Sequence, residues 1–165
     1  MKPRILLAYY SMTGHTRTLA LELCSALQCD LEEIREPRLR KGFSGMLRAL
    51  YDALSRREPP IETAHHDPAV YDMLVLGGPV WAARMASPLR TYAHRYAGHA
   101  PKLAFFCTEG RRGAGQAFDE LVAVCGKKPE ATLAVDARHL PPGMHRDAAR
   151  HFIARLHAAA PTQDL

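Results

Sequence analysis

With 165 residues, 47% hydrophobic and 24% charged, the chain has the size and composition of one globular domain over residues 1–165, which excludes disordered and fibrous classes. The net charge of +5 would suit nucleic acid, an anionic ligand or an acidic partner, but solubility explains it equally well because the basic residues are spread out. Four cysteines without a CxxC pair or zinc-like histidine spacing predict no metal site and a reducing cytoplasm, and no segment approaches the ~18 apolar residues of a membrane span.

Short apolar runs alternate with helical patterns, beginning with a run at Arg4–Tyr10 and a helical pattern at Thr16–Leu27. Compact runs of this kind are typical of parallel strands that are buried on both faces. The further strands are expected at Leu31–Arg35 (an edge strand), Met73–Leu76, Leu103–Cys107 and Leu133–Val135. The further helices are expected from a Ser87 cap and Pro88 to Gly98, over Ala117–Cys125 with Gly126 as terminator, and over Asp147–Ala160. This order predicts an α/β domain with a parallel sheet and helices on both faces.

The segment from residue 41 to residue 60 is an addition to this alternation. Its large apolar residues recur at helical spacing: Phe43, Met46, Leu47, Leu50, Tyr51 and Leu54. Polar residues occupy the opposite face: Arg48, Asp52, Ser55 and Arg56. We favour an amphipathic helix whose apolar face packs on the domain's own sheet. The alternatives are a homodimer surface or a flap beside a ligand site.

Hydroxyl residues and a glycine gather directly after the first expected strand, in ILLAYYSMTGHTRTLA. The turn between that strand and its helix lies beyond the carboxyl edge of a parallel sheet, where ligands bind. A helix N-terminus offers free N–H donors and partial positive charge, Gly14 permits close approach of the backbone, and Ser11, Thr13 and Thr16 add hydroxyl donors. The cluster therefore predicts a phosphate site without a lysine. It matches neither GxxxxGK[ST] nor GxGxxG.

The stretch YYSMTGHTRTLA resembles the phosphate loop of flavodoxins and flavodoxin-like FMN enzymes. Two later stretches are similar to the loops that contact the flavin ring in that family: GGPVWAARMASPLRTY, residues 77–92, and FFCTEGRRGAGQAFDEL, residues 105–121. Each follows an expected strand, so the resemblance covers almost the whole chain. It implies a flavodoxin-like three-layer sandwich with a five-stranded parallel sheet in the order 2-1-3-4-5, and one bound FMN.

The resemblance also implies which residues bind FMN. The residues expected at its phosphate are Ser11, Met12, Thr13, Gly14, His15 and Thr16. Those expected to line the isoalloxazine ring are Pro79, Val80, Trp81 and Ala82, and those expected to form the third wall are Thr108, Glu109, Gly110 and Gly113. Trp81 is the only tryptophan, and a flat, partly apolar ring favours an aromatic side chain against it.

Two features depart from typical electron-carrier flavodoxins, which are acidic. The chain is basic, and Arg84, Arg111 and Arg112 fall in the ring-side loops. Arginines that point inward would raise the reduction potential, or would hold an anionic substrate or the phosphate of NAD(P)H; arginines that point outward would be solvated. Because the chemistry would run on FMN, Arg84 is the one side chain considered for a catalytic role. The loop TEGRRGAG also lacks an aromatic residue, which leaves room for a quinone or nicotinamide.

Three functions remain open on this basis. The first is an FMN oxidoreductase that takes hydride from NAD(P)H and reduces a quinone or similar small-molecule acceptor. The second is a flavodoxin that carries single electrons and docks on redox partner proteins. The third is a basic module for nucleic acid or an acidic protein. The intact phosphate loop and Trp81 argue against it, so we expect no nucleic-acid partner.

Overall fold

The computed structural model describes residues 2–38, 40–140 and 146–160, and it confirms the expected α/β architecture. A parallel sheet has the strand order β2-β1-β3-β5-β6, which is the predicted order 2-1-3-4-5 once an added short strand, β4, is set aside. The strands are β1 (Ile5–Tyr9), β2 (Asp30–Glu33), β3 (Met73–Trp81), β5 (Lys102–Glu109) and β6 (Thr132–Asp136), and β4 (Arg84–Met85) pairs antiparallel with β3.

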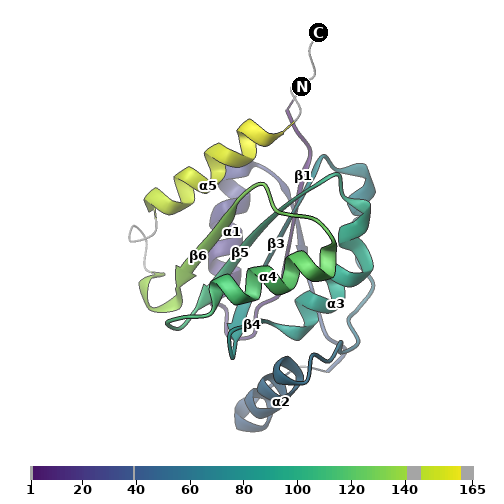
Figure 1. Ribbon diagram of the computed structural model, residues 1–165, viewed down its shortest axis with the longest axis vertical. Coiled ribbons are helices and arrows are strands. Elements are labelled where there is room, and N and C mark those ends of the chain that lie inside the picture. The colour runs from purple at the N-terminus through teal and green to yellow at the C-terminus, as the bar shows by residue number, and fades with distance from the viewer. Residues whose placement is uncertain (1, 39, 141–145, 161–165) are drawn as a thin grey trace.

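Helices cover both faces of the sheet, so the domain has three layers (Figure 1). The helices are α1 (His15–Leu27), α2 (Gly42–Leu54), α3 (Ser87–Tyr96), α4 (Ala114–Cys125) and α5 (Arg146–Ala159), with short 3-10 helices at Pro68–Val70, Ala97–His99 and Ala137–His139. Alternate residues of β1 enter separate cores, because Leu7 packs on the α1 and α5 side and Leu6 on the α3 and α4 side. Among the described residues, no helix combines the length and the apolar character that a bilayer span requires.

Strand β3 is longer than the sequence predicts, because it continues through Gly77, Gly78 and Pro79 to Trp81. The predicted end of this strand at Leu76 is therefore wrong. A side chain at position 77 would overlap the ring of Phe106, so Gly77 makes room for a core aromatic residue. The expected Ser87 cap is also wrong, because α3 begins at Ser87 itself and no side chain caps its N-terminus.

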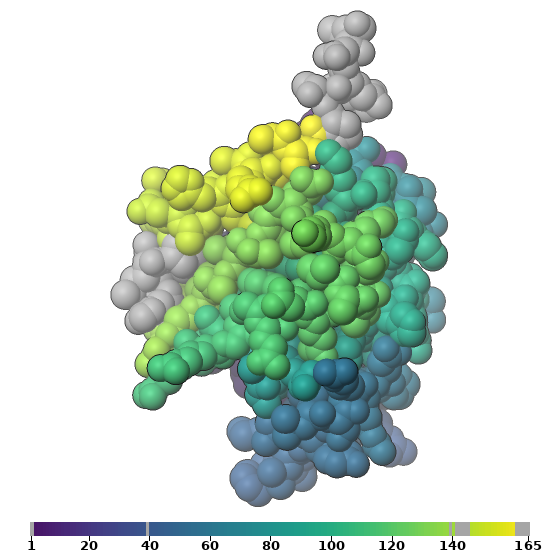
Figure 2. All heavy atoms as spheres, in the orientation of Figure 1, coloured from purple at the N-terminus to yellow at the C-terminus, as the bar shows by residue number. Residues whose placement is uncertain are grey.

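The helix expected between residues 41 and 60 is present as α2, but the favoured packing of its apolar face is wrong. Its six large apolar side chains are exposed by 41–74% (Phe43, Met46, Leu47, Leu50, Tyr51 and Leu54). Its buried residues are Gly45, Ala49, Asp52 and Ala53. Helix α2 thus turns its small residues and one carboxylate toward the domain and its apolar face outward. The helix lies at one end of the molecule (Figure 2).

Candidate functional site

Three segments that the sequence singled out meet at the carboxyl edge of the sheet: the β1–α1 loop, the end of β3 with its turn, and the β5–α4 loop. The Oγ1 atoms of Thr16 and Thr108 lie 2.7 Å apart, which joins the first segment to the third. A Cβ on Gly113 would lie 2.6 Å from the Cα of Ala83, so the third segment packs closely on the second. The structure therefore brings the predicted groups together, while their role in binding stays a prediction.

The β1–α1 loop keeps most of its backbone donors free. The Gly14 amide donates to Ser11 Oγ at 3.1 Å, so one amide is satisfied from within. Within the described part of the chain, the amides of Met12, Thr13, His15 and Thr16 have no hydrogen-bond acceptor. Ser11 Oγ accepts one bond and still has its own proton to donate. The loop is consequently a partly preorganised set of neutral donors at a helix N-terminus, which favours an anion.

Not every predicted hydroxyl in this loop is equally available. Thr16 is buried and its hydroxyl is paired with Thr108. Thr13 is exposed, and its Oγ1 lies 3.3 Å from His15 Nδ1. Ser11 and Thr13 are therefore the side chains of this group that can reach an external ligand without breaking a buried contact.

The turn between β3 and β4 holds two alanines in an unfavourable backbone conformation. Ala82 and Ala83 have φ angles of 50° and 60°, between the paired residues Trp81 and Arg84. Positive φ at both central positions is the signature of a type I′ hairpin turn, which normally favours Asn and Gly. Alanine in this region costs roughly 1 kcal/mol per residue. Gly113 packs closely on Ala83 of this turn.

Trp81 lies at the end of β3 between two side chains that sequence reasoning did not connect with it. The Tyr10 ring meets the Trp81 ring edge-on, with 5.7 Å between the centroids. The Arg40 guanidinium lies 5.5 Å from the centroid of the Trp81 ring, within cation–π range. These two contacts hold the indole in place.

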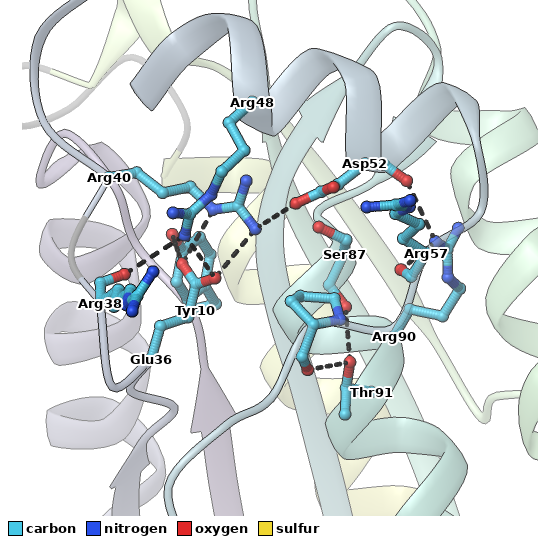
Figure 3. Close-up of polar contacts among 11 residues, drawn as sticks. Tyr10, Glu36, Arg38, Arg40, Arg48, Asp52, Arg57, Ser87, Arg90 and Thr91 are labelled. Carbon is cyan, nitrogen blue, oxygen red and sulfur yellow. Dashed lines mark hydrogen bonds and ion pairs between the residues drawn. The ribbon is translucent and has the colours of Figure 1, made fainter. Parts of the chain in front are cut away.

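Arg40 is the centre of a buried polar network beneath α2 (Figure 3). Its Nε and Nη2 atoms donate to Glu36 at 2.9 Å each, and Nη2 also lies 2.8 Å from Asp52 Oδ2. The Tyr10 hydroxyl donates to the same Glu36 carboxylate at 2.9 Å. Burial, together with the Glu36 charge, raises the pKa of Tyr10 above its usual value of 10. Burial opposes the charge of Arg40, but its bonds to Glu36 and Asp52 raise its pKa on balance.

Two cavities adjoin this network. One of about 470 Å³ has Ser11 and Met12 on one side and Glu36 and Arg40 on the other. A second, of about 640 Å³, lies between Glu36 and α2, where Arg48 and Tyr51 line it. Volumes of this size fall within the range of small-molecule sites. The first cavity adjoins the free donors of the β1–α1 loop.

The β5–α4 loop offers a ligand fewer unpaired polar side chains than its sequence suggests. The Glu109 carboxylate accepts the Ala114 amide at 2.9 Å and thus caps α4. Arg111 and Arg112 are exposed. Arg84 lies 3.4 Å from Glu120 of α4, so a carboxylate already faces its charge.

The side chains at this edge are donors and apolar surfaces rather than a nucleophile with its base. The nearby Cys107 is buried, and burial raises the pKa of its thiol to about 12, which makes it a core residue. Tyr10, Glu36 and Arg40 are the residues at this edge that sequence reasoning missed. A tyrosine at the end of the first strand was visible, but the sequence holds no pattern that places Arg40 over Trp81.

Comparisons with known proteins agree with this architecture. A family model described as Flavodoxin matches residues 4–136. The crystal structure of a flavoprotein from Lactobacillus acidophilus NCFM in complex with FMN has a TM-score of 0.71 at 20% identity, covering 80% of this chain and 93% of that chain. The flavodoxin, WrbA-like protein from Agrobacterium tumefaciens has a TM-score of 0.59 at 15% identity, covering 94% and 96%. At these identities the solved structures establish the fold, and no curated protein matches the sequence.

Proposed function

The chain belongs to the flavodoxin family, and from that premise we propose that it binds FMN and passes hydride or electrons from NAD(P)H to a quinone or similar acceptor. The observation that carries the proposal is the set of free amides at residues 12, 13, 15 and 16, next to the Ser11 and Thr13 hydroxyls. The related Lactobacillus acidophilus flavoprotein, whose structure contains FMN, supports the choice of ligand.

The residues present fit a phosphate monoester. The donors of the β1–α1 loop are neutral, numerous and placed at the positive end of α1. The Glu109 carboxylate of the β5–α4 loop is directed to the N-terminus of α4, where it accepts the Ala114 amide. Backbone donors suit a dianion because they need not move to bind it.

Each wall of the proposed site has a distinct part in binding. Ser11, Thr13 and the loop amides would hold the phosphate, and Thr16 would support them through Thr108. Pro79, Val80, Trp81 and Ala82 would line the isoalloxazine ring, and Thr108, Glu109, Gly110 and Gly113 would form the third wall. Tyr10 and Arg40 would keep the indole in place against the ring. FMN, when bound, supplies the hydride or electron transfer, and the chain supplies binding and orientation.

Substitutions in the β1–α1 loop test the ligand. We expect the double change Ser11→Ala with Thr13→Ala to weaken FMN binding at least 100-fold, since each lost bond to a charged group costs about 1.5–3 kcal/mol. The matched control is Thr18→Ala, because Thr18 lies in α1 directly after this loop and its hydroxyl bonds to the Gly14 carbonyl. Fluorescence quenching of added FMN measures both. Equal affinity in the double variant and the control would place the phosphate elsewhere.

Turnover assays test the reaction separately. We expect NADH or NADPH to be oxidised steadily in the presence of FMN and a soluble quinone. Absence of that turnover, in a protein that binds FMN tightly, would instead assign the role of an electron carrier that docks on partner proteins.

A further inference from the structure

We propose that α2 is a membrane-docking helix, and that its exposed apolar face enters the surface of a bilayer that contains anionic lipids. The inference concerns a surface that the flavin proposal does not use. It rests on three observations: the size of the apolar face, the network that fixes its direction, and the charges around it.

The apolar face of α2 is larger than ordinary surface variation explains. Its six large side chains are those from Phe43 to Leu54, and each is exposed by at least 41%. With about 150–250 Å² for a large aromatic side chain and similar areas for the others, the face amounts to roughly 700 Å². The largest apolar patch on a typical monomer is about 300–600 Å² and often has a function. Helix α2 projects at one end of the molecule, where a flat partner can reach it (Figures 1 and 2).

The direction of this face is fixed by the opposite side of the helix. Asp52 points inward to Arg40, whose side chain is 0% exposed and which also binds Glu36 (Figure 3). Gly45 packs so closely that a Cβ there would lie 2.7 Å from the Arg40 carbonyl carbon. Rolling the helix to bury Phe43 and Leu47 would pull Asp52 out of this network and leave buried charges unpaired. The apolar face therefore stays outward in the folded protein.

The charges around the face favour an anionic surface. Four exposed cations lie on α2 or beside it, Arg38, Lys41, Arg56 and Arg57, while a fifth, Arg48, lies 3.7 Å from Glu36. Glu36 and Asp52 bind Arg40 and Glu58 lies 2.9 Å from His94, and with these three carboxylates counted the stretch from residue 36 to residue 58 carries a net charge of +3. A second copy of the chain would bring this net positive charge against an equal one, whereas anionic headgroups neutralise it. An apolar face rimmed by Lys and Arg is also typical of helices that lie in the membrane interface.

Vesicle co-sedimentation of the full chain tests the proposal. We expect binding to vesicles of phosphatidylcholine with phosphatidylglycerol, and at least tenfold weaker binding to phosphatidylcholine alone or in high salt. Leu47→Ser with Leu50→Ser should reduce binding at least tenfold. The matched control is Leu21→Ser with Val70→Ser, since these residues are 49% and 53% exposed outside α2, and it should bind as the wild type does.

A charge variant and a solution measurement complete the test. Lys41→Gln with Arg56→Gln should weaken binding about fivefold per removed cation. Circular dichroism confirms that each variant is folded, as expected for exposed positions. Equal binding by the Leu47/Leu50 variant and the control, or no preference for anionic vesicles, would overturn the proposal. A dimer in analytical ultracentrifugation that the Leu47/Leu50 change dissolves would also overturn it, in favour of a second copy. All these readings are made without FMN, so they are independent of the proposed reaction.

Discussion

Helices α1 and α2 have the same length, 13 residues, and both are amphipathic. The apolar face of α1 points into the domain, whereas that of α2 points to the outside. Helix α1 buries its large apolar residues Leu19, Leu23 and Leu27 against the sheet. Helix α2 buries Gly45, Ala49 and Ala53 and exposes its large apolar residues. A periodic pattern thus identifies a face of a helix and does not identify what that face meets.

The difference follows from where each helix falls in the chain. Helix α1 crosses from β1 to β2 and lies directly over the sheet, together with α5. Helix α2 follows the edge strand β2 and reaches the domain where α3 already covers the sheet. What it meets there is α3 and the β3–β4 hairpin, and its Asp52 binds the buried Arg40. Small residues fit that contact, and the large apolar residues are left outside.

The largest expected effect comes from removing the cation that fixes α2. Arg40→Met leaves Asp52 buried without a counter-charge and Glu36 with only the more distant Arg48, which should lower the free energy of unfolding by about 3–5 kcal/mol at neutral pH. The measurement is urea unfolding followed by the fluorescence of Trp81, which Arg40 contacts. Arg48→Met is the control, because Arg48 is 44% exposed and 3.7 Å from Glu36, and should cost less than about 1 kcal/mol. Similar losses in both variants would mean that the network does not anchor α2.

The comparison can be tested directly with the same substitution in each helix. Leu23→Ala in α1 should cost about 2–5 kcal/mol, because Leu23 is 1% exposed and its removal leaves a cavity. Leu47→Ala in α2 should change the free energy of unfolding by no more than about 0.5 kcal/mol, because Leu47 is 51% exposed. Chemical denaturation measures both. A loss of several kcal/mol at Leu47 would show that the apolar face of α2 is buried in solution.

Glycine substitutions test how closely α2 packs on the rest of the domain. Gly45→Ala should lower the free energy of unfolding by about 1–3 kcal/mol, since the added Cβ meets the Arg40 backbone at 2.7 Å. Gly115→Ala in α4 is the control, because no atom lies within 4 Å of its added Cβ, and it should raise that energy by roughly 0.5–1 kcal/mol. Thermal unfolding distinguishes the expected loss of stability in Gly45→Ala from the expected gain in Gly115→Ala. Stabilisation by Gly45→Ala would indicate that α2 does not pack closely on Arg40.

Much of the fold was predictable from sequence because its signals are local. The run Arg4–Tyr10, the hydroxyls around Gly14 and the helical spacing after them specify a strand, a loop and a helix within one short stretch. The resemblance of three such loops to one family then supplied the sheet order, which local patterns alone do not determine. The three loops met at one edge because the carboxyl ends of parallel strands share that edge.

The remaining features depend on contacts between distant residues. Local patterns end the strand at Leu76, but β3 continues through Gly77 and Gly78, where Phe106 and Leu89 occupy the space of a side chain. The outward face of α2 depends on the ion pair between Arg40 and Asp52, and the position of Trp81 depends on Arg40 as well. No spacing rule links these residues, because they come from different elements.

The smallest expected effect is a pH dependence on the polar side of α2. Burial and the Glu36 charge raise the pKa of Tyr10 above the value of about 10 that it has in the unfolded chain. Above pH 10 the unfolded state therefore releases a proton that the native state retains, and this contribution to stability, complete below pH 10, declines as the pH rises. Tyr10→Phe should cost about 1 kcal/mol below pH 9, through the lost bond to Glu36, and its difference from the wild type should shrink between pH 10 and 11. Urea unfolding across this range measures the difference, and a constant gap would mean that the Tyr10 hydroxyl is solvated and that the network beneath α2 is more open than its contacts indicate.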